Sequence, residues 1–282
     1  MVPNDRAMKP HMLSVGVLCL ALLTARGAAA QIPTLPEGAR TRWVIDDPEE
    51  IVGWLTFDPA TVADRIPRYL RFITVGELAT GGVGWATAYL ADHPAHGEWG
   101  ISFFEIVRMG TFAIDGRSPD WPPDGAAALW FARVAATDPS TDLGAGLPLL
   151  ALEFWIPDAA YTAYMLGRGH YATAGDVRLA RDHDGEWVGS VSVVGLTATV
   201  RCTPIGPITG GADSAGAQVF FPPASSDLGT LVRVAFAGHR EQRCGEAAPW
   251  NLSGTHPLVR GVLLAPPTLQ FGYRLVGGAY GR

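Results

Sequence analysis

The sequence predicts a mainly β fold: a single closed or doubly layered β domain with a few short helices. Three observations carry this prediction. Strand-like runs recur along most of the 282 residues, the segments with helical signals are short, and no repeat or linker divides the chain. With 48% hydrophobic and 17% charged residues, the composition is that of a globular protein.

The first thirty residues have the pattern of a secretory signal peptide. Arg6 and Lys9 form a positive region, 12–25 is an apolar run, and Ala28–Ala30 is a small-residue cleavage site. We expect cleavage after Ala30 and a secreted or periplasmic protein, in which residues 31–282 form one β domain. An uncleaved N-terminal anchor is the alternative. No later stretch is long and apolar enough for a membrane-spanning helix.

Charge and lysine content exclude several functions. The formal net charge is −6, and removal of residues 1–30, with Asp5 and the cations Arg6, Lys9 and Arg26, would make it −8. An acidic protein is a poor partner for nucleic acid or for an anionic membrane surface. Lys9 is the only lysine. The mature protein therefore has no lysine for Schiff-base catalysis.

Two cysteines remain after the signal peptide, Cys202 and Cys244. In an oxidising compartment a disulfide is the simplest interpretation of such a pair. A metal site would need more ligands at short spacing, and a catalytic thiol lacks a flanking motif. We expect the disulfide and no metal.

The N-terminal half begins with a Pro-rich segment, 31–45, which is expected to be an extended arm. Asp58 and Pro59 predict the start of a short helix that ends near Ile66. A Pro/Gly-rich loop is expected at 115–125. Alternating or continuous apolar runs predict strands at 71–78, 83–90, 99–109, 129–136 and 149–156.

The central segment combines a strand, a helix and a long hairpin. After the apolar run to Ile156, Asp158 predicts the N-cap of a helix that Gly167 ends. Strands are expected at 170–181 and 186–201, joined by a turn at Asp184-Gly185. A change of phase near Val193 predicts a bulge or bend.

The C-terminal part is less regular. Residues 203–217 are rich in Gly, Pro, Ala and Ser and are expected to form a loop, and 238–254 is expected to be irregular. Strands are predicted at 230–236 and within 262–276.

Three segments resemble a known family. "FDPATVADRIPRYLRF" (57–72), "WGISFFEIVRM" (99–109) and "LEFWIPDAAYTAYMLGRGHYA" (152–172) are similar, in order and spacing, to segments of acetoacetate decarboxylase-like proteins. The resemblance implies an antiparallel β barrel or cone around an apolar cavity. It also implies that the strand 99–109 carries an active-site glutamate, Glu105.

The chain departs from that family at the catalytic segment. In the decarboxylases, Gly-Arg-Glu leads into Gly-(Phe/Tyr)-Pro-Lys, whose lysine forms the Schiff base. Here the segment 167–177 reads GRGHYATAGDV and has neither the proline nor the lysine. Classical acetoacetate decarboxylation is therefore not expected, and no cofactor is implied.

Glu105, Arg168 and His170 are the candidate catalytic residues. Glu105 lies in an apolar strand, where burial would raise its pKa and suit it to proton transfer; an outward position or an ion pair with Arg108 is the alternative. Arg168 could bind a carboxylate or cap a helix end. His170 is a candidate proton carrier, although most single histidines on strands are structural.

Other side chains are weaker candidates for the functional site. Glu153, which lies in an apolar strand, is a candidate for proton transfer to the same extent as His170. His93, His96 and Glu98 form a loose loop cluster that is better read as solvated than as a metal site. The candidate ligand-binding residues are aromatic, and most aromatic residues of this kind are ordinary core. They are Phe103, Trp85, Trp155 and Tyr164.

These features support two hypotheses about function. The first is an exported acetoacetate decarboxylase-like protein that binds a small apolar keto or carboxylate molecule, with lyase or isomerase chemistry through Glu and His proton transfer. The second is a non-catalytic carrier or sensor that keeps the cavity. The missing lysine favours the carrier, whereas a charged Glu and Arg in an apolar setting favour the enzyme. The sequence leaves the ligand and the oligomeric state open.

Overall fold

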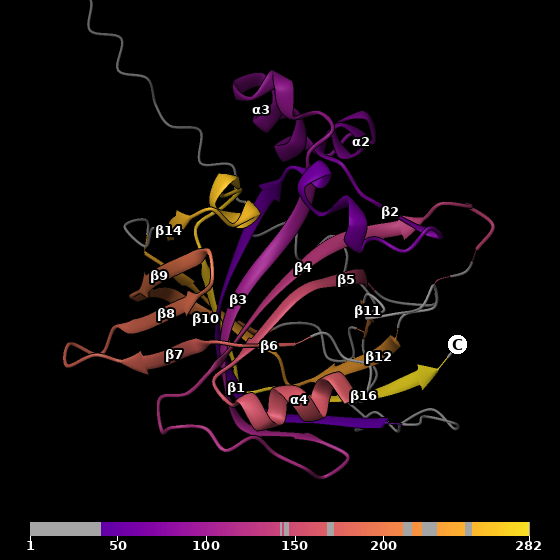
Figure 1. Ribbon diagram of the computed structural model, residues 1–282. Helices are drawn as coiled ribbons and strands as arrows, with labels where there is room; N and C mark the ends of the chain where they lie inside the picture. Colours follow the sequence, from indigo (N-terminus) through magenta and orange to yellow (C-terminus); the bar gives the residue numbers. More distant parts are fainter. Residues whose placement is uncertain are drawn as a thin grey trace, which may run out of the picture.

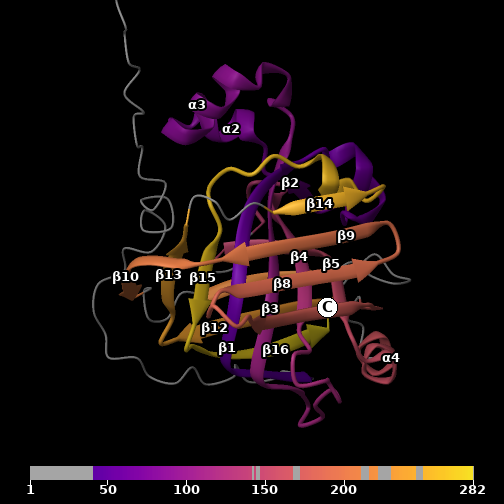
Figure 2. The same ribbon diagram turned by 90° about the vertical axis from the view of Figure 1, so that its left-hand side faces the viewer.

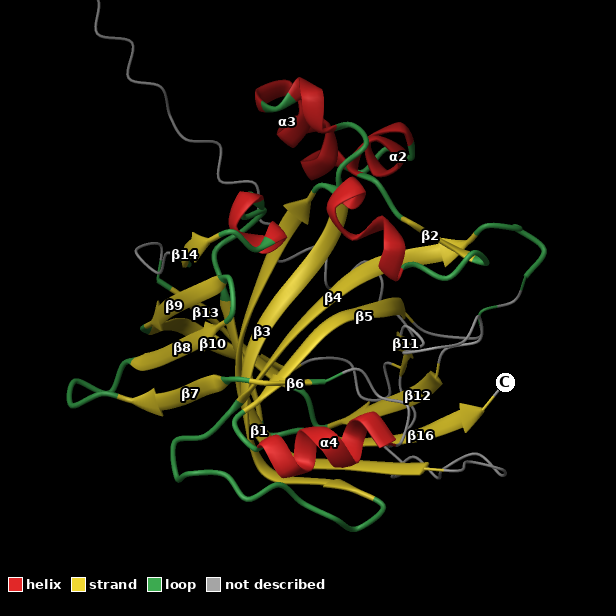
Figure 3. Ribbon diagram, viewed as in Figure 1, coloured by secondary structure: helices red, strands yellow, loops and turns green. Residues whose placement is uncertain are grey.

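Two β-sheets and a set of short helices form the part of the chain that the computed structural model describes (Figures 1 and 3). The described residues are 41–141, 143, 147–167, 172–210, 216–221, 230–245 and 250–281. Twelve strands belong to the large sheet and four to the small sheet. The protein is therefore mainly β, as the sequence predicts.

The large sheet contains the strands β1 (Thr41–Phe57), β2 (Leu70–Phe72), β3 (Gly100–Ile114), β4 (Ala127–Ala136), β5 (Leu147–Ile156), β6 (Thr173–Ala174), β10 (Pro204–Gly210), β11 (Gly216–Phe221), β12 (Thr230–Ala237), β13 (Arg240–Cys244), β15 (Thr268–Phe271) and β16 (Arg274–Gly281). The small sheet contains β7 (Asp176–Arg181), β8 (Trp187–Val193), β9 (Leu196–Cys202) and β14 (Asn251–Gly254). The helices are η1 (Pro59–Arg65), α2 (Val75–Thr80), α3 (Gly84–Asp92), η2 (Pro94–His96), α4 (Ala159–Gly167) and η3 (Pro257–Arg260).

The pairings of the large sheet lead back to where they start. β3 pairs with both β1 and β4, and from β1 the pairings continue through β16, β12, β11 and β5 to β4. The β5–β11 and β5–β6 pairs are parallel, so the sheet is mixed and not wholly antiparallel as expected. This circuit gives β3, β4 and β5 an inner face, toward the other strands of the circuit, and an outer face.

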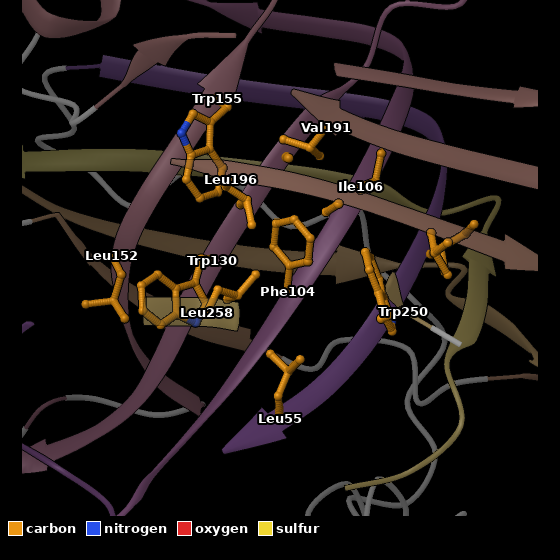
Figure 4. Close-up of a cluster of buried hydrophobic side chains, with 14 of the residues drawn as sticks. Leu55, Phe104, Ile106, Trp130, Leu152, Trp155, Val191, Leu196, Trp250 and Leu258 are labelled. Carbon is orange, nitrogen blue, oxygen red and sulfur yellow. The ribbon is translucent and has the colours of Figure 1, made fainter. Parts of the chain in front are cut away.

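The outer face is covered by the small sheet, whose strands cross those of the large sheet (Figure 2). Phe104, Trp130 and Trp155 point into this interface and pack with Val191 and Leu196 of the hairpin, as Figure 4 shows. The disulfide between Cys202 of β9 and Cys244 of β13 confirms the predicted pairing. It ties the small sheet to the large one within the same buried cluster.

The inner face carries a second apolar cluster. Val107, Leu129 and Phe154 belong to it, and Tyr161 and Met165 of α4 pack against them. Helices α2 and α3 lie at one end of β3, and α4 lies toward the other end (Figure 1). Among the described helices, none has the length and apolar character needed to cross a membrane.

The strands bend sharply at one level of the sheet. Asp47 of β1 and Gly272, between β15 and β16, have positive φ angles of 48° and 65°. A side chain at Gly110 of β3 would lie about 3 Å from the carbonyl oxygens of Asp46 and Asp47. Consequently the strand alternation changes phase, and odd-numbered Val107 and even-numbered Phe112 both enter the inner cluster.

Several elements differ from the sequence prediction. Residues 41–45 of the expected arm belong to β1, a strand from Thr41 to Phe57, and residues 31–40 lie outside the described residues. The expected strand 83–90 is helix α3, and 71–78 contains only the short β2 before helix α2. Thr74 and Glu77 form a capping box that starts α2, a signal that the strand interpretation overlooked.

The remaining differences lie in the second half of the chain. The expected loop 203–217 contains β10 and the first residues of β11, and the irregular segment 238–254 contains β13 and β14. Gly195, with φ of 79°, turns the chain between β8 and β9, where only a bulge or bend was expected. Strands β4, β5 and β12 and helix α4 match the prediction closely, whereas β3 begins as predicted but continues to Ile114, beyond the expected end at 109. Pro59–Arg65 is a 3₁₀ helix, with Asp58 as its N-cap.

Candidate functional site

Two carboxyl side chains lie beside each other on the inner face. In the β1–β3 ladder, Glu50 is opposite Val107 and Val52 is opposite Glu105. The two glutamates are therefore diagonal cross-strand neighbours on one face of the sheet. Glu50 is 4% exposed and Glu105 is largely buried. A pair of buried carboxyls is costly unless at least one of them keeps its proton.

The two carboxyls bind protons more tightly than ordinary glutamates do. Burial raises the pKa of Glu50 to about 7, although a hydrogen bond from Tyr273 partly opposes this change. Burial also raises the pKa of Glu105 well above its usual value, and the neighbouring charge of Glu50 adds to the rise. Near neutral pH the pair therefore holds a proton that it can donate or exchange.

Tyr273 completes the polar group. Its side chain is buried, and its hydroxyl donates to Glu50. Burial and the two glutamates raise the pKa of this phenol, so it remains a hydrogen-bond donor. The ring of His239 stacks on Tyr273, with 5.6 Å between ring centroids. Burial lowers the pKa of His239, against an opposing effect of Glu241.

Aromatic side chains continue the inner face beyond Glu105. Phe103 lies two residues before Glu105 in β3 and therefore on the same face of the strand. Its ring contacts those of Trp54 of β1 and Phe131 of β4, with centroid distances of 5.2 and 4.9 Å. The structure thus places the predicted ligand-binding residue Phe103 next to Glu105. The arrangement combines an apolar wall with a proton-carrying polar end.

The other predicted ligand-binding residues are dispersed. Trp155 lies on the outer face, against Phe104, and so does not share a wall with Glu105. Trp85 is part of α3 and packs in the cluster between the helices and β3. Tyr164 of α4 belongs to the inner cluster, and its hydroxyl donates to the carbonyl oxygen of Ile114. Trp155 and Glu105 therefore lie on opposite faces of the sheet, and the sequence alone did not predict which face each side chain takes.

Arg168 and His170 lie outside the described residues. Their assignment as catalytic residues stays a prediction. The alternative for Glu105, an ion pair with Arg108, does not hold, because Arg108 bonds to Glu49 and its guanidinium lies over the ring of Trp187. Arg108 therefore faces the small sheet, and Glu105 faces the inner cluster.

Glu153 has a different environment on the outer face. Its carboxylate accepts hydrogen bonds from Arg65 of η1 and from His256, which lies before η3. The Nδ1 atom of His256 accepts from the amide of Leu258, so Nε2 carries the proton that binds Glu153. Every charge of this cluster has a partner, and the cluster joins two helices to β5.

The histidine loop and the hairpin turn have local roles. His96 stacks on Trp99 at 3.7 Å and bonds to the hydroxyl of Tyr89, beside a hollow of about 430 Å³ that does not include Glu105. Among the described residues, Asp182, His183 and Asp184 are close enough to share a cation, but they are largely exposed at a turn. Neither feature points to a bound group.

The sequence prediction missed Glu50, Tyr273 and His239. Glu50 could have been found, because the mostly apolar run 51–57 predicts a strand and Glu50 directly precedes it. Tyr273 and His239 lie in segments without a functional signal. Tyr273 reaches Glu50 at the bend at Gly272, where its carbonyl oxygen accepts from the amide of Asp47, and His239 stacks on Tyr273.

Comparisons with known proteins identify the fold. No family model matches the sequence, and no curated protein is similar to it in sequence. Among solved structures, acetoacetate decarboxylase from Legionella pneumophila is similar with a TM-score of 0.50 and 11% identity, over 92% of each chain. An acetoacetate decarboxylase-like enzyme from Sphingomonas wittichii RW1 has a TM-score of 0.48 and 14% identity, over 91% of this chain and 99% of that one. The chain has the acetoacetate decarboxylase fold, as the resemblance implied.

Proposed function

We propose that this chain, with its acetoacetate decarboxylase fold, is an exported protein that binds a small apolar keto or carboxylate molecule on the inner face and moves a proton on it. The reaction would be of the lyase or isomerase type and would use no Schiff base. The strands of the circuit would enclose the ligand as a barrel or cone. Glu105 is the proposed acid and base, and Glu50 and Tyr273 hold its proton in place.

The observation that carries the proposal is the buried Glu50–Glu105 pair. A carboxylate in such a pair can remove a proton from the carbon next to a carbonyl group. The protonated carboxyl of the pair can donate a hydrogen bond to the oxygen, on which negative charge develops. The proton then returns to carbon or leaves for solvent. No imine intermediate, and so no lysine, is required for this step.

Proton exchange in heavy water tests the proposal directly. The purified protein would be incubated with a panel of 2-oxo and 3-oxo acids, and loss of the α-proton signal would be followed by nuclear magnetic resonance. Glu105→Gln should slow the exchange about 10²- to 10⁴-fold. Glu49→Gln is the matched control, because Glu49 lies on the same stretch of β1 and bonds to Arg108 on the outer face. Equal rates for wild type and Glu105→Gln would refute the assignment.

A carrier or sensor is the second candidate. The absence of a lysine from residues 31–282 and the aromatic wall of Trp54, Phe103 and Phe131 favour it, because such a wall binds apolar molecules without chemistry. Native mass spectrometry of the exported protein would show a retained small molecule. Retention together with no exchange of any oxo acid would favour the carrier over the enzyme.

A further inference from the structure

Arg133 of β4 is a cation within an otherwise apolar stretch of the inner face. Its neighbours Ala132 and Val134 pack in the outer cluster, whereas Leu129 and Phe131 pack in the inner cluster. The alternation of the strand therefore turns Arg133 inward. Its cross-strand partner, Leu149 of β5, also belongs to the inner cluster.

The guanidinium of Arg133 has no acceptor in the part of the chain that the structure describes. Its Nε atom is buried without a hydrogen-bond partner, and no described carboxylate forms an ion pair with it. Burial lowers its pKa, and no neighbouring charge contributes to that change. The side chain as a whole is partly buried. A guanidinium with a buried, unbonded Nε is unfavourable, and the anion of a ligand would supply the missing partner.

The aromatic wall connects Arg133 to the carboxyl pair. Leu129 is directly opposite Glu105, and Phe131 is opposite Phe103. Arg133 follows on the same face, about 13 Å from Leu129 along the strand at a rise of ~3.3 Å per residue. Phe103 and Phe131, which are in contact, therefore lie between the cation and the proton-carrying end.

We infer that Arg133 binds a carboxylate of the substrate that is remote from the reacting carbon. This inference rests on the proposed function, because it assigns the reacting end to Glu105. The substrate is then an acid whose apolar body lies along Phe103 and Phe131. The planar guanidinium suits a carboxylate, which it can hold with two parallel hydrogen bonds.

Equilibrium binding tests this inference without any turnover. The probes are phenylacetate, 3-phenylpropionate, 4-phenylbutyrate and 5-phenylpentanoate, each paired with its primary amide, and calorimetry gives the affinities. In wild type, at least one acid should bind more tightly than its amide by about 10- to 100-fold. Arg133→Gln should abolish this preference. Arg71→Gln is the control, since Arg71 is a half-exposed arginine of β2 that bonds to Glu77.

Thermal unfolding without ligand separates binding from a structural role. Removal of an unpaired buried charge should leave the melting temperature unchanged or raise it. A melting temperature lowered by several degrees in Arg133→Gln would assign Arg133 to the framework. The inference would also be overturned if Arg133→Gln kept the preference, or if no acid bound better than its amide.

The two proposals fail in different ways. If Arg133→Gln abolishes the preference for acids but Glu105→Gln does not slow proton exchange, the carboxylate site at Arg133 is supported and the proposed chemistry is refuted. Exchange that depends on Glu105, with acid binding indifferent to Arg133, would do the reverse.

Discussion

The two faces of β3, β4 and β5 differ in whether their buried charged side chains have partners within the protein. On the outer face, Glu153 accepts from Arg65 and His256, so its charge is satisfied within the protein. On the inner face, Glu50 and Glu105 are like-charged neighbours with raised pKa values. Arg133, on that same face, has no acceptor among the described residues. A paired cluster holds the fold together, whereas unbalanced groups are suited to a ligand.

The two faces also differ in how they are closed. The small sheet covers the outer face with the side chains of Val177, Leu179 and Val191, and a disulfide fixes it there. The inner face is bounded by strands of its own circuit and by α4. Because the outer face is a complete core, changes there should act on stability. Changes on the inner face should act on binding and on pH dependence.

The largest effect on stability is expected from the disulfide of the outer face. Replacement of Cys202 and Cys244 together by Ala frees a loop spanning 42 residues, which should lower the free energy of unfolding by about 4 kcal/mol. Urea denaturation of the variant and of wild type, both without reductant, measures the difference. A loss below about 1 kcal/mol would mean that the small sheet stays attached by packing alone.

The carboxyl pair should make stability depend on pH. Glu50 has a pKa of about 7 in the folded protein, against 4.5 for an ordinary glutamate. The folded state therefore binds this proton more tightly than the unfolded state. The resulting stability is complete below pH 4.5 and is lost as the pH rises through 7, by about 3 kcal/mol. Glu105 acts in the same direction.

Glu50→Gln removes that titration. The variant and wild type should have similar stability at pH 5, and the variant should be the more stable at pH 8. Urea denaturation at pH 5, 6, 7 and 8 gives the two curves. Curves that run parallel across this range would show that Glu50 is not buried as a proton-carrying group.

A smaller effect is expected from the paired charge of the outer face. Glu153→Gln weakens the bonds to Arg65 and His256 and should cost about 2 kcal/mol of stability at neutral pH. Glu186→Gln is the control, because Glu186 bonds to Arg201 near the surface and its removal should change little. Equal stability of the two variants would show that the outer cluster does not support the fold.

Sequence reasoning located the framework well where apolar runs were long. The strands β3, β4 and β5 have side chains buried on both faces. Their sequences are therefore continuous apolar runs, which predict strands. It also identified the hairpin turn at Asp184-Gly185 and the helix cap at Asp158, because these depend on local backbone chemistry. Helix α3 was mistaken for a strand, since its bulky residues alternate over a short span.

Only some residues of the candidate site could be predicted from the sequence. Glu105 stood out as a lone carboxylate in an apolar strand, and Cys202 and Cys244 as the two cysteines that remain after the signal peptide. By itself the sequence determined the mainly β fold and the absence of a lysine from residues 31–282. Which carboxyl, phenol and guanidinium share a face depended on strand register and on the bend at Asp47 and Gly272. A shift of one residue in register moves a side chain to the opposite face, and only the tertiary pairing sets that register.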